Sequence, residues 1–163
     1  MITIAPKVFI QQPPSSDEEK AFREYITALG RVCRTETFHG EYSAKYEFMA
    51  EPSKDDNENS SVRMDVLIDH VYLWYKIRVY PDVFYLYQQG DFKSIAAAVM
   101  HETCHLFTEP IAKLFMWDAS ASQVEHYRDT IERQTERICN AVMYAMPKEW
   151  YMPDAIMKHE ANK

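Results

Sequence analysis

The spacing of apolar residues changes from helical to alternating near residue 42, and this change limits the folds open to the chain. Upstream of that point, one apolar stripe recurs at helical intervals and predicts a helix from about residue 17 to 34. The stripe consists of Phe22, Tyr25, Ile26, Leu29, Val32 and Cys33. Ser16 and Glu19 stand at the spacing of a capping box at the start of this helix.

Downstream, apolar and polar residues alternate, as they do in half-buried strands. The alternation covers residues 42–48, 62–68 and 71–79, and its phase shifts near Asp69, which predicts a turn or bulge there. Residues 83–87 would add a short strand. The acidic, polar segment 51–61 is interpreted as a mobile loop, because the strands on both sides fit one small, mainly antiparallel, twisted sheet.

Helical spacing returns after Gly90. We expect a helix from Asp91 to about Phe107, a second short helix that restarts at Pro110 and runs to Trp117, and a last long helix. The last helix would begin at Ser120 or Ser122 and end at Met146, before a proline. This order predicts an α+β chain, and its 163 residues suit a single domain, 1–163.

Composition excludes some classes of function. The formal charge is −7, without a stripe of lysine and arginine, which argues against nucleic acid as the main partner. No stretch approaches the roughly 18 apolar residues of a membrane span, and no signal peptide is evident. Three widely spaced cysteines do not form a disulfide framework. These features favour a cytoplasmic protein.

The segment His101-Glu102-Thr103-Cys104-His105 carries the chemistry of the sequence. On a helix, residues four apart project from one face, so the two imidazoles can bind one zinc ion. Glu102 is rotated by about 100° from His101, where it can reach a water on the open side of the metal. His101 and His105 are therefore predicted metal ligands, with Glu102 as general base.

A hydrolytic zinc site needs a third protein ligand, and the last helix offers four candidates. Taking 100° per residue, Glu132 lies about 90° from the mean direction of the apolar stripe, Glu125 about 110° and Glu136 about 130°. The stripe consists of Val124, Ile131, Thr135, Ile138 and Val142. A ligand on a packed helix should lie at the edge of its buried face, which favours Glu132 and leaves Glu136, Glu125 and His126 as alternatives.

The motif and Glu132, 27 residues after His105, resemble the gluzincin type of the zincin-like fold. The chain looks most like the small ImmA/IrrE-like and minimal HExxH peptidases of bacteria and phages. In that family, a glutamate followed by small and apolar residues at +3, +6 and +7 supplies the third ligand. Thr135, Ile138 and Cys139 stand at these positions, where the family commonly has Ala, Phe and Ala.

The resemblance implies a zinc metallopeptidase with a zincin-like domain that acts on a peptide or protein substrate. In such clefts, an edge strand aligns an extended peptide by main-chain pairing. The alternative is a non-catalytic binding or regulatory protein on the same scaffold, with a structural or vestigial metal site. The two hypotheses differ in the role that they give Glu102.

Overall fold

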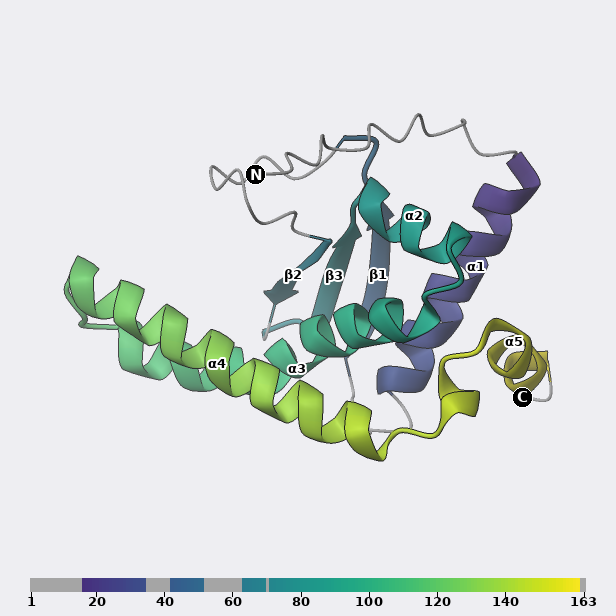
Figure 1. Cartoon of the computed structure of the whole chain (residues 1–163). Coiled ribbons are helices and arrows are strands. Elements are labelled where there is room, and N and C mark those ends of the chain that lie inside the picture. The colour runs from purple at the N-terminus through teal and green to yellow at the C-terminus, as the bar shows by residue number, and fades with distance from the viewer. Residues whose placement is uncertain (1–15, 35–41, 52–62, 70, 162–163) are drawn as a thin grey trace, which may run out of the picture.

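The computed structural model of the chain describes residues 16–34, 42–51, 63–69 and 71–161. Within these residues the chain is an α+β structure, as predicted, with one small sheet and several helices (Figure 1). In chain order, the elements are α1 (Ser16–Val32), β1 (Ser43–Phe48), β2 (Met64–Asp69), β3 (Trp74–Val79), α2 (Pro81–Gln88), α3 (Phe92–Met116), α4 (Ala121–Ala145), the short 3₁₀ helix η2 (Lys148–Trp150) and α5 (Pro153–Ala161).

The three strands pair in the order β1-β3-β2, so the last strand of the sequence lies in the middle. β2 and β3 are antiparallel, with Ile68 opposite Tyr75, whereas β1 and β3 are parallel, with Tyr46 opposite Ile77. The sheet is therefore mixed rather than mainly antiparallel. β2 comes between β1 and β3 in the sequence, but in the sheet it lies at the edge, on the other side of β3 from β1.

The turn between β2 and β3 lies where the sequence predicts it, but it is longer. The carboxylate of Asp69 accepts hydrogen bonds from the amides of Val71 and Tyr72, each at 3.0 Å. Leu73 follows with a left-handed φ of 51°. These three residues cannot extend the strand, so β3 begins at Trp74 and not at Val71.

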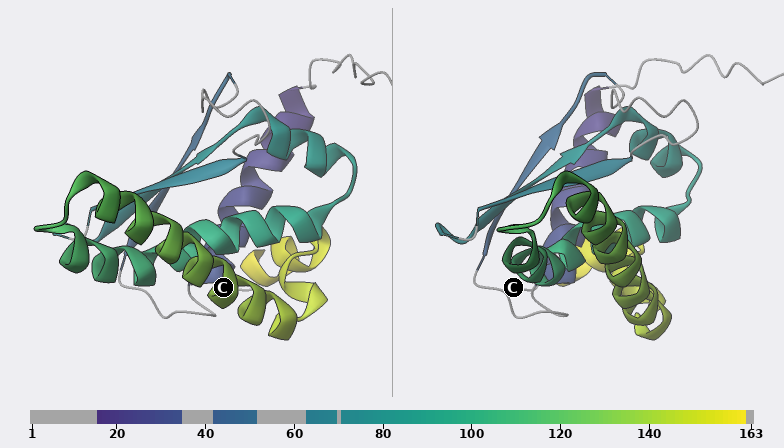
Figure 2. Two further views of the ribbon diagram at one scale, coloured as in Figure 1. Left: turned by 60° about the vertical axis from the view of Figure 1, so that its left-hand side comes forward. Right: turned by 90° about the vertical axis from the view of Figure 1, so that its left-hand side faces the viewer.

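The helices pack on one face of the sheet, which is plain in both views of Figure 2. Strand residues that face the helices are buried, including Tyr75, Ile77 and Val79, while their neighbours Lys76 and Arg78 remain partly exposed. The core is completed by the apolar face of α1 and by Ile95, Val99 and Met100 of α3, among others.

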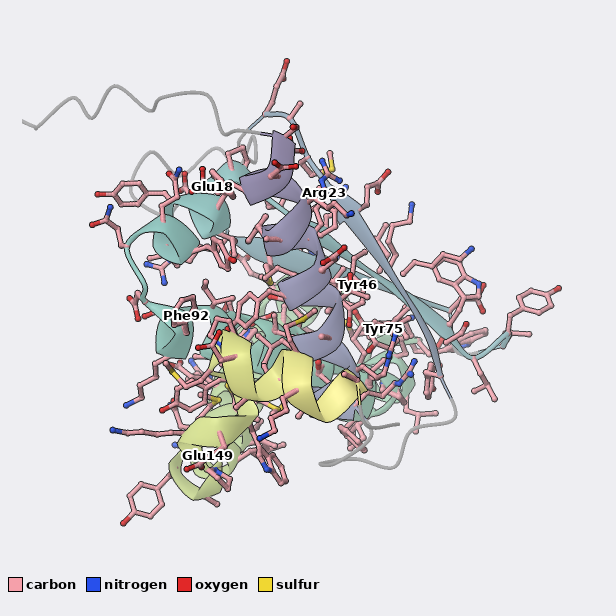
Figure 3. All side chains as sticks on the ribbon, turned by 90° about the vertical axis from the view of Figure 1, so that its right-hand side faces the viewer. Glu18, Arg23, Tyr46, Tyr75, Phe92 and Glu149 are labelled. Atoms are coloured by element: carbon pink, nitrogen blue, oxygen red, sulfur yellow. The ribbon has the colours of Figure 1, made fainter. Side chains whose placement is uncertain are left out.

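The contact between α1 and the sheet depends on a glycine. Gly30 lies in the last turn of α1, and a Cβ atom there would lie only 1.7 Å from the hydroxyl oxygen of Tyr46. Figure 3 shows Tyr46 and Tyr75 next to each other against α1. Gly30 therefore lets β1 approach the helix closely, at some cost in helix propensity.

Two elements differ from the sequence prediction between residues 81 and 116. Residues 83–87 form part of a helix, α2, and not a strand, because Pro81 stands at its first turn with Asp82 beside it. α3 does not end at Phe107 and restart; it runs through Pro110 to Met116. Pro110 therefore stands inside the helix, where it has no amide hydrogen to donate.

The last long helix is confirmed, with Ser120 as its N-cap and Gln123 completing a capping box. The chain then continues through η2 into α5, which the sequence analysis did not predict. Tyr25 of α1 donates a hydrogen bond of 2.8 Å to the carbonyl of Tyr151, and Ile156 of α5 is fully buried. The segment 51–61, interpreted above as a mobile loop, lies outside the described residues except for Glu51. None of the helices in the described part is long and apolar enough to cross a membrane.

Candidate metal centre

α3 places the His101–His105 segment at the contact with α4. The helix begins at Asp91, whose carboxylate accepts a hydrogen bond from the amide of Ser94 at 3.2 Å. Ile95, Val99 and Leu106 are buried, as their shared face predicts. His101 and His105 point in nearly one direction, because helical residues four apart share a face. This face differs from the one that carries Ile95, Val99 and Leu106.

α4 runs beside α3 in the opposite direction, and both views place the two helices side by side (Figures 1 and 2). Two contacts set their register. The hydroxyl groups of Thr108 and Thr135 lie 2.7 Å apart in a buried position. The Cys139 thiol donates a hydrogen bond of 3.5 Å to the carbonyl of Ala97. α4 therefore packs closely on α3 at position 97.

In this register the carboxylate of Glu132 lies opposite both histidines. Nε2 of His101 is 3.3 Å from one oxygen of Glu132, and Nε2 of His105 is 3.6 Å from the other. One ligand atom from each of the three residues lies within 4.8 Å of the others. The structure therefore brings together the three residues that the sequence analysis selected as a set.

The separations fit a tetrahedral ion. Zinc binds imidazole nitrogen and carboxylate oxygen at about 2.0–2.2 Å, and tetrahedral angles then place the ligand atoms roughly 3.4 Å apart. Direct N–H···O hydrogen bonds are usually shorter, with a mode near 2.9 Å. The nitrogen–oxygen distances of 3.3 and 3.6 Å match the first value better. Two imidazoles and one carboxylate are also a donor set that zinc accepts.

The protonation states of two of these residues suit a cation. Burial lowers the pKa of His105, although the nearby Glu132 acts in the opposite direction. The adjacent imidazole of His101 lowers the pKa of Glu132, and the charge of His105 adds to this effect. A neutral imidazole and an ionised carboxylate are the forms that bind metal.

Glu102 lies in a different environment. The residue is only 8% exposed, and burial raises the pKa of its carboxyl group well above the ordinary value, with the charges of Glu132 and Asp65 adding to the shift. A raised pKa suits a general acid–base residue that works near neutral pH. A cation at the three-residue cluster would oppose this shift.

The other candidate ligands do not join the cluster. Glu125, His126 and Glu136 are exposed on α4, and the group of three contains only His101, His105 and Glu132 among the described residues. The buried residues of α4 are Thr135 and Cys139. Ile138, which the sequence analysis placed in the buried stripe, is 37% exposed.

The predicted stripe of α4 is confirmed in part, because Thr135 is buried and Val124, Ile131 and Val142 are partly buried. The observed contact face passes through Glu132, Thr135 and Cys139, at helical spacings of three and four residues. The side chain of Glu132 is 59% exposed, so it lies at the edge of this contact and not inside it. The sequence analysis selected the residue that meets the histidines.

Cys104, inside the motif, belongs to the core. It is fully buried, and burial raises the pKa of its thiol to about 12. Such a thiol carries almost no thiolate at neutral pH and is a poor nucleophile or metal ligand. Cys104 therefore serves packing in the core.

A cavity of about 430 Å³ adjoins the cluster, and the sequence analysis did not predict it. His105, Glu132 and Arg128 are among the residues that line it, and Arg128 lies one helical turn before Glu132 on α4. The sequence analysis did not select Arg128. The spacing of four residues between Arg128 and Glu132 was the available signal that both face the same space.

Comparison of the chain with the models of known protein families, with curated protein sequences and with solved structures gave no match.

Proposed function

We propose that the chain is a zinc-dependent metallopeptidase. The observation that carries this proposal is the convergence of His101 and His105 of α3 with Glu132 of α4, which follows His105 by 27 residues. Each of the three would supply one ligand atom to the ion. The resemblance to zincin-like peptidases supports the same assignment of these residues.

A bound zinc ion would supply a Lewis acid and would lower the pKa of a coordinated water toward about 7. The role of Glu102 is to hold and move a proton: it would accept one from the attacking water and deliver it to the leaving amine. Its burial supports this role, because a carboxyl group with a raised pKa both accepts and releases protons near neutral pH.

The edge strand of the sheet supports a peptide as substrate. β2 pairs with β3 on one side only within the described residues, so its other edge can accept an extended chain. β2 also packs against α3, and the charge of Asp65 on this strand acts on Glu102. A peptide that extends the sheet at β2 would therefore pass close to Glu102.

The test combines metal analysis with one substitution. The purified protein is expected to contain about one zinc per chain and to hydrolyse members of a random peptide mixture. Glu102→Gln should keep the zinc and lose hydrolysis, whereas Glu136→Gln, an exposed residue of α4, should change neither. Absence of zinc, or full hydrolysis by Glu102→Gln, would contradict the proposal.

One observation favours the alternative, a binding or regulatory protein in which the metal is structural. α4 buries only two residues, Thr135 and Cys139, so a cation bridging α3 and α4 would add considerably to its attachment. His101→Ala separates the two functions. It should lower the melting temperature strongly if the metal is structural and only modestly if the metal is catalytic.

We expect the protein to act in the cytoplasm. Its three cysteines are free and buried, and burial raises the pKa values of their thiols. Reduced, unreactive thiols are typical of proteins in reducing compartments.

A further inference from the structure

The cavity beside the metal cluster has an apolar wall and a charged rim. It lies between the second half of α3 and the first half of α4, and Ala112, Met116 and Ile131 provide the apolar surface. Its volume of about 430 Å³ falls within the range of 300–1,000 Å³ that is usual for ligand sites. Since His105 and Glu132 line it, a ligand held at the metal would extend into it.

The charged residues around this cavity differ in whether they already have an ionic partner. Lys113 forms an ion pair of 3.2 Å with Glu109 on the same helix. The carboxylate of Glu132 turns to the two histidines instead of to Arg128. No ion pair involving Arg128 is formed by the described residues, so its guanidinium group is available to a ligand.

The balance becomes positive when a metal binds. Lys113 and Arg128 contribute two positive charges, Glu109 and Glu132 two negative ones, and a divalent cation adds two more positive charges to this zero sum. The chain as a whole carries −7. A cavity of opposite sign to its protein, adjoining a cation, favours an anionic ligand group.

We propose that this cavity receives a carboxylate of the bound peptide and that Arg128 is the residue that selects for it. The inference rests on the proposed function and adds to it a substrate class: peptides with a carboxylate beside the bond to be cleaved. The group can be an acidic side chain or the free C-terminus, since both present the same planar anion to a guanidinium group.

Three probes on one scaffold distinguish these sources. Each carries a hydroxamate, which binds zinc, joined through a malonyl group to one residue: alanine amide with no carboxylate, glutamic acid amide with a side-chain carboxylate, or alanine with a free C-terminus. Calorimetry of the zinc-loaded protein gives the Kd of each probe without relying on turnover. One carboxylate probe should bind about tenfold more tightly than the neutral probe, the scale of one charge-assisted hydrogen bond.

Arg128→Gln should abolish this preference and leave the Kd of the neutral probe unchanged within about twofold. Arg133→Gln is the matched control, because Arg133 lies on the same helix and donates its hydrogen bond to Thr130. Equal Kd values for the three probes, or a preference that survives Arg128→Gln, would overturn this inference alone. Absence of zinc, or failure of every probe to bind the zinc-loaded protein, would overturn the proposed function and this inference with it.

Discussion

The hydroxyl groups of Thr108 and Thr135 lie 2.7 Å apart in the buried contact between α3 and α4. Thr135 follows Glu132 by one helical turn, and Thr108 follows His105 by one turn. The pair therefore fixes the register of α4 along α3 next to the three candidate ligands. A shift by one turn would carry the Glu132 carboxylate about 5.4 Å along the helix axis, away from the histidines.

Thr135→Val tests this positioning role. Valine keeps the shape of threonine but removes the hydrogen bond, so we expect a loss of about 1–2 kcal/mol in the free energy of unfolding, measured in urea. Zinc affinity should fall about tenfold, because such supporting groups orient ligands. Thr130→Val is the control: its hydroxyl binds the carbonyl of His126 in its own helix. Equal effects of the two substitutions would argue against a specific role for Thr135.

The choice among the glutamates of α4 can be measured directly. Glu132→Gln should weaken zinc binding by at least about 100-fold, since it removes a ligand rather than a group that supports one. Glu136→Gln, on the exposed side of the helix, should stay within about twofold of the wild type. Competition with a chromogenic chelator gives both affinities. The assignment of Glu132 is wrong if the two variants bind zinc equally.

Glu102 should make the metal-free protein less stable as the pH rises. Its folded-state pKa is raised above the ordinary value of 4.5, mainly by burial, so the native state holds this proton more tightly than the unfolded chain. The resulting stability is present below pH 4.5 and is lost as the pH rises toward the folded pKa.

Glu102→Gln removes this dependence, because glutamine stays neutral. The variant should gain stability relative to the wild type as the pH increases from 4.5, when both are treated with a chelator and unfolded in urea at each pH. Glu132, whose pKa is lowered, is present in both proteins and largely cancels from the difference. A difference that does not change with pH would show that Glu102 is not desolvated.

Gly30→Ala should destabilise the protein, although alanine is the better helix former. The added methyl group would meet the hydroxyl oxygen of Tyr46 at 1.7 Å and its ring atoms at 2.5 and 2.9 Å. We expect a loss of about 1–3 kcal/mol in the free energy of unfolding, the range for an overfilled core.

The sign should reverse when the ring is absent. In a Tyr46→Val background, Gly30→Ala should stabilise the protein by about 0.5–1 kcal/mol, the difference in helix propensity. Urea unfolding of the four proteins gives the coupling energy between the two sites. Destabilisation of equal size in both backgrounds would mean that Tyr46 is not the obstacle.

Long periodic segments were predictable from the sequence, because their pattern reflects which face each helix buries. α1 follows it closely, and so does the first half of α3, whereas α4 follows it in part. The pattern does not contain the order of strands, so the central position of β3 and its parallel pairing with β1 could not be derived. α2 was missed because a run of apolar and aromatic residues suits both a strand and a short helix.

The candidate site was predictable to the extent that local geometry decides it. The spacing of His101 and His105 sets their convergence on any helix. The position of Glu132 depends instead on how α4 lies on α3, through the pair Thr108–Thr135 and the contact of Cys139 with Ala97. These contacts join residues distant in sequence, and the spacing of apolar residues along the chain does not reveal which of them pair. Zinc binding by Glu132 stays a prediction until the metal is measured.

Glu132 on α4 faces the two histidines of α3, so the three candidate ligands lie on two different helices. A cation held by all three would therefore link its own binding to the association of α3 with α4. Chelation would then weaken the attachment of α4, and a partner that separated the two helices would release the ion.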